Sequence, residues 1–280
     1  LTVNDLTLPS INCPGNFTVS CASEVPPANA MAIVATDGCG GNVAVIHHKD
    51  SIVDFICVNR YLIHRIYKAI DACGNEAFCT QLITVEDLTG PGIVCPPSLT
   101  INCESPSDTS QTGIPQITDR CGGQFVQLNH SDNRVDGSCN YNYEIQRSWT
   151  ATDLCNNSSA CVQTIAVQDT SRPVFLPPAD VTISCTQNAN DLLITGNASM
   201  VSNNCGRPKI DYDDNIDLTG CNGSGKIIRT WLVTDDCGNA STAIQTITVR
   251  CPKFDLALKK TLSMSNGTKF GDTVTFKITI

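Results

Sequence analysis

The cysteines of this chain recur with a period of 82 residues, and this spacing constrains the fold more than any other feature. The chain has 280 residues and 17 cysteines. A fixed period of this size is typical of tandem arrays of small structural units. The three sets are Cys13, Cys21, Cys39, Cys57, Cys73 and Cys79; Cys95, Cys103, Cys121, Cys139, Cys155 and Cys161; and Cys185, Cys205, Cys221 and Cys237.

The text around the cysteines repeats as well and sets the boundaries of the units. The opening "LTVNDLTLP" corresponds to "ITVEDLTGP", which closes the first full copy. The repeated pattern stops after Val249. We therefore predict a tail of a preceding repeat at 1–8, repeat 1 at 9–89, repeat 2 at 90–172, repeat 3 at 173–252 and the start of a further β domain at 253–280.

Within each repeat, the secondary-structure signals are short β runs. Stretches such as "FTVSC", "VAVIHH" and "TQLITVED" are separated by clusters of Gly, Pro, Asn and Asp, and no helical period persists. We predict an all-β chain of tandem immunoglobulin-like β-sandwiches. About 80 residues is little for a self-sufficient core, so disulfide bonds are expected.

Composition narrows the compartment and the partners. The formal charge of -9 argues against nucleic acid and against anionic lipid as partners. No run of 18 apolar residues is present, so this segment is not expected to insert into a membrane. Because no Cys-x-x-Cys occurs, disulfides are a better interpretation of the cysteines than structural zinc. Disulfides place the chain in a secreted or cell-surface location.

Repeat 3 lacks two of the six cysteines that repeats 1 and 2 have, and this joint loss indicates which two cysteines are bonded. The positions that match Cys13 and Cys79 are Pro177 and Ala243, and the other four cysteines remain. Joint loss predicts the bonds Cys13–Cys79 and Cys95–Cys161. The remaining four cysteines of a repeat allow three connectivities, of which an immunoglobulin-like topology favours the one listed next. It gives Cys21–Cys57, Cys39–Cys73, Cys103–Cys139, Cys121–Cys155, Cys185–Cys221 and Cys205–Cys237, with Cys251 unmatched.

Aspartates recur at two positions of the repeat. Asp71, Asp153 and Asp235 precede a turn cysteine by two residues, where a carboxylate can accept hydrogen bonds from turn amides. Calcium is the functional alternative for acidic residues of this kind, with Asp5, Asp87 and Asp169 at the linkers as candidate ligands. None of these residues has the spacing of a calcium-binding helix–loop–helix motif, and no other metal or cofactor is predicted.

Three further patterns are interpreted as structural. "GCNGSGK" (220–226) resembles a phosphate-binding loop, but Ile227 stands where Ser or Thr is needed, so we expect a turn. We expect His47, His48 and His64 on strand surfaces. The equivalent Tyr67, Trp149 and Trp231 follow an arginine by two residues; we expect core aromatics, with sugar stacking as the alternative. No catalytic motif appears, so an enzyme is not predicted.

The chain resembles the hyalin repeat family over about 9–250, through "CPGNFTVSC", "TDGCGG", "IDACGNEAFC" and "ITVED". The resemblance implies an immunoglobulin-like fold and a bond between the cysteine of the Cys-Pro element and the one after the Gly-Asn turn. The extra cysteines resemble a variant of giant surface proteins of Bacteroidetes-type bacteria, which are often exported by the type IX system. That resemblance further implies possible O-glycosylation at Ser51 and Thr273, in Asp-Ser-Ile and Asp-Thr-Val.

Taken together, these observations predict a non-enzymatic, rod-like stalk segment of a large secreted adhesin or gliding-motility filament protein. Its expected partners are an extracellular surface, a polysaccharide or neighbouring copies. Two alternatives stay open: a filament subunit joined by strand exchange, and an array of carbohydrate-binding modules.

Overall fold

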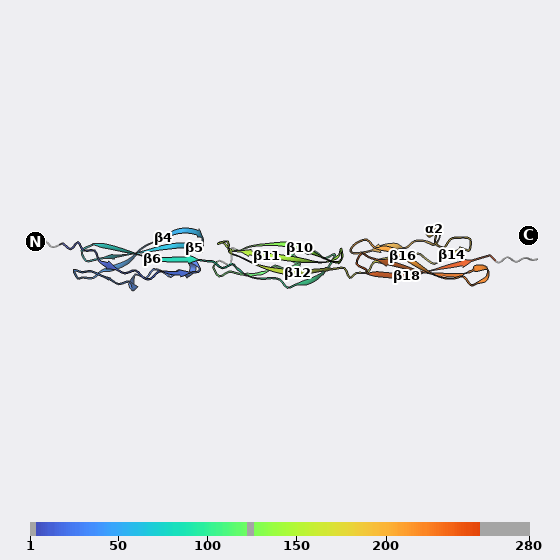
Figure 1. Cartoon of the computed structure of the whole chain (residues 1–280), viewed down its shortest axis with the longest axis horizontal. Helices are drawn as coiled ribbons and strands as arrows, with labels where there is room; N and C mark the ends of the chain where they lie inside the picture. The colour runs from blue at the N-terminus through green and yellow to red at the C-terminus, as the bar shows by residue number, and fades with distance from the viewer. Residues whose placement is uncertain (1–3, 122–125, 253–280) are drawn as a thin grey trace, which may run out of the picture. The chain divides into compact units, whose positions relative to one another are not determined.

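The computed structural model describes residues 4–121 and 126–252, and these residues fold mainly as β-strands (Figure 1). The chain divides into two compact units. Of the described residues, unit 1 holds 4–121, 126–174, 202–209 and 234–240, and unit 2 holds 175–201, 210–233 and 241–252. Two segments of repeat 3 thus belong to unit 1. Among the described residues, no helix has the length and apolar character needed to cross a membrane.

Each repeat contains one four-stranded sheet with the same strand order. The first strand of the sheet lies parallel to the last strand of the repeat, at a constant offset, as in Phe17 with Ile83 and Val181 with Ile247. The sheets are β2 (Phe17–Val19), β6 (Glu76–Glu86), β5 (Arg60–Ile70) and β4 (Ala44–Cys57); β8 (Leu99–Asn102), β12 (Ser158–Gln168), β11 (Asn142–Thr152) and β10 (Gln127–Cys139); and β14 (Val181–Ser184), β18 (Ala240–Arg250), β17 (Gly225–Thr234) and β16 (Lys209–Asp217).

A short two-stranded sheet completes each sandwich. These sheets pair β1 (Ser10–Ile11) with β3 (Ala35–Thr36), β7 (Gly92–Val94) with β9 (Gln116–Thr118), and β13 (Val174–Leu176) with β15 (Ser199–Ser202). The all-β fold class is as the sequence predicts, and the fold is a series of disulfide-bonded β-sandwiches.

Alternation along the central strands builds the cores. In β5 every second residue from Ile63 to Ala69 is buried, because successive side chains of a strand point to opposite faces. The aromatic side chains are buried as expected: Tyr67 and Trp149 are each 2% exposed and Trp231 is 1% exposed. His47 and His48 lie exposed on β4, and "GCNGSGK" forms the turn before β17, which includes the short helix η3 (Cys221–Gly223).

Short helical turns were not predicted from the sequence. They are α1 (Thr109–Thr112), α2 (Leu192–Thr195), η1 (Ala22–Glu24) and η2 (Ala30–Ala32). Asp108 and Asp191 accept a hydrogen bond at the start of α1 and α2 through their side chains, which is the usual role of an N-cap. One helical turn carries too few residues to show a period, so the sequence pattern could not reveal these elements.

The disulfides inside repeats follow the joint-loss argument. Cys13 is bonded to Cys79 and Cys95 to Cys161, each across 66 residues. Repeat 3 has Pro177 and Ala243 at these positions and so lacks the bond. Thr273 and the predicted start of a further domain at 253–280 lie outside the described residues. Ser51 lies on β4, opposite His64 of β5.

Candidate functional site: the cross-linked junctions

Four disulfides join one repeat to the next rather than closing a repeat on itself. At junction 1, Cys21 bonds to Cys121 and Cys57 to Cys155. At junction 2, Cys103 bonds to Cys205 and Cys139 to Cys237, and all four cysteines belong to unit 1. The Cα–Cα distances are 5.0, 5.3, 6.4 and 5.2 Å, within the usual range for disulfides.

These bonds overturn the predicted pairings within repeats. The wrong predictions are Cys21–Cys57, Cys39–Cys73, Cys103–Cys139, Cys121–Cys155, Cys185–Cys221 and Cys205–Cys237. In four of these pairs the error was to bond the cysteines to each other, because the ends of successive repeats meet and each of these eight cysteines bonds across a junction. The predicted pairs Cys39–Cys73 and Cys185–Cys221 are not bonded in the structure. Cys39, Cys73, Cys185, Cys221 and Cys251 remain unpaired.

A turn that recurs in every repeat positions one cysteine at the end of the repeat where the chain enters it. Asp71 Oδ1 accepts hydrogen bonds from the backbone N–H of Cys73 (2.8 Å) and Asn75 (2.9 Å), as predicted for this aspartate. Gly74 has φ +89°, a conformation that suits glycine. Hydrogen bonding from the Asn75 side chain, above all, holds the pKa of Asp71 below its ordinary value.

The same turn is fastened to the linker in all three repeats. The side-chain amide of its asparagine donates to the backbone carbonyl of the linker aspartate at 3.2 Å each time. The pairs are Asn75 with Asp5, Asn157 with Asp87, and Asn239 with Asp169. Each turn cysteine is therefore held beside the linker, which brings Cys155 and Cys237 to the preceding repeat.

Asn59 ties the parts of junction 1 together. It is 7% exposed, accepts from Ala22 N–H and donates to the Cys121 carbonyl, both at 2.9 Å. Its own carbonyl accepts from the linker N–H of Asp87 at 2.9 Å. The ion pair of Arg120 with Glu24 also spans the junction, but it is exposed and such pairs contribute little. Buried hydrogen bonds and disulfides thus fix this junction.

Three carboxylates converge beside Asn59. Asp87, Asp119 and Asp153 each place an oxygen within 4.8 Å of the others, around a small cavity of about 10 Å³. Oxygen ligands of this kind suit a hard cation such as calcium, for which they would supply three of the usual six to eight ligands. The candidate ligands Asp5 and Asp169 lie in different surroundings. Asp5 groups with Asp37 and Cys39.

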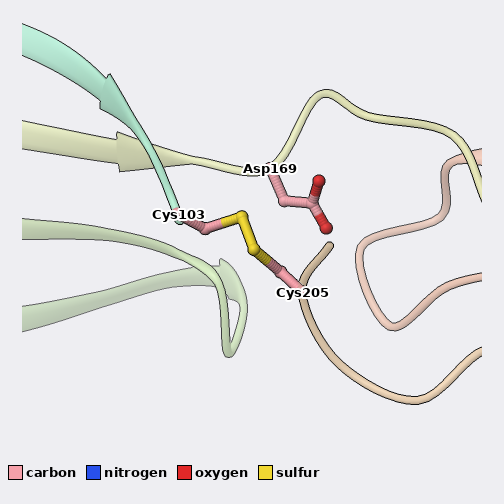
Figure 2. Close-up of side chains that lie close together, drawn as sticks. All are labelled: Cys103, Asp169 and Cys205. Atoms are coloured by element: carbon pink, nitrogen blue, oxygen red, sulfur yellow. A yellow bond between two sulfur atoms is a disulfide. The ribbon is translucent and has the colours of Figure 1, made fainter. Parts of the chain in front are cut away.

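Asp169 lies against a disulfide (Figure 2). One of its carboxylate oxygens lies within 4.8 Å of the sulfurs of Cys103 and Cys205. These sulfurs are bonded to each other, so they offer no thiolate to a metal. Asp169 is 4% exposed; its Oδ1 accepts from the Ser171 N–H, whereas its Oδ2 is buried without a hydrogen-bond partner. The linker position is therefore a place where a side chain points at a junction cysteine.

The candidate arginine–aromatic pairs are core elements. Arg65, Arg147 and Arg229 are 5%, 2% and 0% exposed, and each binds an aspartate of the neighbouring strand. Those aspartates are Asp50, Asp132 and Asp214. Because the rings are buried as well, these pairs present no face for stacking on a sugar.

Comparison with known proteins gives distant relatives. No family model matches the chain. It is 27% identical over 192 residues to the sushi, von Willebrand factor type A, EGF and pentraxin domain-containing protein 1 of Rattus norvegicus and to that of Mus musculus. The match covers 66% of this chain and 5% of each relative, so the chain spans a small part of their length.

Solved structures with similar topology are cadherin ectodomains. The protocadherin GammaB4 extracellular domain is 15% identical, covering 87% of this chain and 49% of that one, with a TM-score of 0.32. Drosophila N-cadherin EC1-4 is also 15% identical, covering 89% and 76%, with a TM-score of 0.30. At this level of similarity, the cadherins indicate nothing about ligands of this chain.

Proposed function

We propose that this chain is a non-enzymatic, extracellular spacer segment of a larger adhesion-type protein, built to carry tension. The observation that carries this proposal is the pair of disulfides at each of two successive junctions. Linkers between domains are ordinarily the places where few contacts cross. Here each linker is bypassed by two covalent bonds, so tension does not depend on the packing of neighbouring repeats.

The covalent network shortens the path along which force travels. The shortest route from Cys13 to Cys237 runs eight residues to Cys21 and crosses to Cys121. It then runs eighteen residues to Cys139 and crosses to Cys237. A fully extended chain measures about 3.5 Å per residue. The oxidised segment can therefore extend to about 90 Å, whereas the reduced segment, with 224 residues between these cysteines, can reach about 780 Å.

The disulfides support the extracellular location in this proposal. Six disulfides in the described residues require an oxidising compartment. The buried polar residues that recur in every repeat, such as Arg147 with Asp132, make structural contacts, and this favours a non-enzymatic role.

The finer form of the proposal is the stalk of a secreted cell-surface adhesin or gliding filament protein, with a polysaccharide or another surface as partner. Cys39 and Cys73 are exposed and occupy the positions that bond to a preceding repeat at both junctions. They favour covalent continuation to a preceding repeat. If that repeat lies in another copy, the chain is a filament subunit. The buried Trp149 weighs against the carbohydrate-binding alternative.

Single-molecule extension tests the load-bearing role. Stretched from its ends, the oxidised chain should gain the full length of the Cys13–Cys237 segment only after a reductant is added. A variant in which the eight junction cysteines, Cys185 and Cys251 are replaced by serine keeps the two bonds within repeats and allows no other bond to shorten repeat 3. Its route runs sixteen residues from Cys79 to Cys95 and seventy-six from Cys161 to Cys237, so the segment should reach about 320 Å.

The matched control replaces Cys13, Cys79, Cys95 and Cys161 by serine instead. It removes the bonds within repeats and leaves the short route through Cys21–Cys121 and Cys139–Cys237 unchanged. The control should therefore extend like the unaltered chain, since the flanking residues add the same length in every protein. The proposal fails if the oxidised chain extends as far as the variant without junction cysteines.

A further inference from the structure

Position 251 differs in kind from its two equivalents. Asp87 follows the last residue of β6 and Asp169 follows that of β12, whereas Cys251 follows that of β18. In repeat 2 the side chain at this position lies against Cys103, as Figure 2 shows for Asp169. The residue equivalent to Cys103 in repeat 3 is Cys185. A cysteine thus replaces the linker aspartate beside Cys185, whose equivalents in repeats 1 and 2, Cys21 and Cys103, each bond to the following repeat.

Strand register brings Cys185 and Cys251 together. The parallel pair β14 and β18 aligns Ile183 with Val249 and Ser184 with Arg250, so the next pair in register is Cys185 with Cys251. The Cys185 N–H donates to the Arg250 carbonyl at 3.4 Å, which continues the pairing beyond the strands. Neighbouring strands lie about 4.8 Å apart, a separation that disulfides span. Both residues belong to unit 2.

Two local contacts hold Cys251 in this place. Its N–H donates to Ser224 Oγ at 2.9 Å, and its side chain packs against the core cluster that contains Ile183 and Val249. The two thiols are in contact, and the hydrogen bond with Cys251 raises the pKa of the Cys185 thiol. Cys221, the partner that the sequence predicted for Cys185, lies on η3, which precedes β17.

We propose that Cys185 and Cys251 form a disulfide that closes repeat 3 on itself, in place of the bond that Cys21 and Cys103 make to the following repeat. Forming the S–S bond releases two protons and two electrons. These reduce the disulfide of an oxidised dithiol carrier or of a small-molecule disulfide to two thiols. The exchange of aspartate for cysteine at one position then makes Cys185 unavailable to a following repeat, and Cys221 is the remaining cysteine of the pair that repeats 1 and 2 use at a junction.

Peptide mapping of the whole chain tests the proposal. The chain is produced in an oxidising compartment, equilibrated with oxidised glutathione, alkylated and digested without reduction. Mass spectrometry should recover the peptide of Cys185 linked to that of Cys251, with Cys221 alkylated. Recovery of Cys185 linked to Cys221 or to another chain, or alkylation of both Cys185 and Cys251, would overturn the proposal.

Two variants sharpen the result. Cys251→Asp restores the linker residue of the other repeats, and Cys185 should change from protected to alkylated while the six other bonds persist. Cys221→Ser is the matched control, and the Cys185–Cys251 peptide should remain. Loss of that peptide in the control would show that Cys221 takes part in the bond. Since mapping of the unaltered chain decides the pairing by itself, the proposal stays testable if a variant does not fold.

Discussion

Repeats 2 and 3 have the same strand order but hold their sheets together differently. Repeat 2 has the disulfide Cys95–Cys161, whereas repeat 3 has Pro177 and Ala243 at these positions. Repeat 3 buries its arginine ion pair more deeply. The side chain of Asp214 is 13% exposed beside Arg229, whereas that of Asp132 is 37% exposed beside Arg147. The repeat that lacks the equivalent of the Cys95–Cys161 bond thus has the better-shielded arginine ion pair.

Two further contacts distinguish the core of repeat 3. The Arg229 guanidinium lies 4.0 Å from the centre of the Tyr212 ring, and Trp231 Nε1 donates to Gln245 Oε1 at 3.3 Å. In repeat 2 the Trp149 Nε1 is buried without a hydrogen-bond partner. Repeat 2, in contrast, has two junction disulfides at each of its ends. The disulfide equivalent to Cys95–Cys161 is therefore replaced by other contacts in repeat 3, whereas two disulfides recur at each of the two junctions.

The largest expected effect comes from removing the arginine. Arg229→Met leaves Asp214 without its partner in a shielded site, and breaking a buried pair costs about 3–5 kcal/mol. Arg147→Met should cost clearly less, because water reaches Asp132. Repeats 2 and 3 have one tryptophan each, so variants that keep only Trp231 or only Trp149 report the denaturant midpoint of one repeat. Equal losses in the two repeats would contradict the difference in shielding.

Exchanging the internal disulfide is the second test. Replacing Cys95 and Cys161 by alanine should destabilise repeat 2 by about 2–4 kcal/mol, the usual contribution of a disulfide. Introducing Pro177→Cys with Ala243→Cys should stabilise repeat 3 in the oxidised state and leave the reduced state unaffected. The Trp149 and Trp231 midpoints are measured with and without reductant. An alanine variant as stable as the parent would mean that the bond in repeat 2 adds nothing.

Sequence reasoning recovered the fold and half of the disulfide logic. The short β runs follow from patterns within one repeat, and the Cys13–Cys79 bond follows from the joint loss of its equivalents in repeat 3. The junction bonds do not, because pairing across a junction depends on which repeat ends meet. Spacing could not reveal them either: Cys57–Cys155 and Cys139–Cys237 both span 98 residues, but the period makes the separations of the wrong pairs Cys21–Cys57 and Cys103–Cys139 equal as well.

The carboxylates at the junction show the same limit. Asp87 was identified from its place in the linker, but Asp119 and Asp153 come from two other loops of repeat 2. The convergence of Asp87, Asp119 and Asp153 needs the docked repeat. The aromatic residues were predicted to lie in the core, but the ion pairs of the buried arginines were not. Their aspartate partners lie fifteen residues away, on a strand whose register the pattern leaves open.

Substituting the buried glutamine should have a smaller effect. Gln245 donates to the carbonyls of Ala179 and Thr195, and Gln163 donates to those of Pro97 and Thr112. Substitution by leucine leaves these carbonyls without a donor, which should lower the free energy of unfolding by about 1–3 kcal/mol in either repeat. Gln245→Leu also leaves the Trp231 N–H without an acceptor, so the loss of unfolding free energy should be larger by about 1 kcal/mol. The tryptophan reporters are retained, and a larger loss for Gln163→Leu would reverse the comparison.

Acid should remove the stability that the ion pair of Asp132 with Arg147 contributes to repeat 2. The hydrogen bond from Arg147 holds the pKa of Asp132 below its ordinary value in the folded chain. The unfolded chain then binds more protons as pH falls below about 4, so the stability that this carboxylate contributes at higher pH is lost as pH falls through its folded pKa. The effect should be small, because the side chain is more than one third exposed. Asp132→Asn should flatten the acid dependence of the Trp149 midpoint and leave the Trp231 midpoint as in the parent. If parent and variant have the same Trp149 profile, the ion pair of repeat 2 adds no acid-sensitive stability. Repeat 2 would then depend on its disulfide alone for the stabilisation that repeat 3 obtains from Arg229.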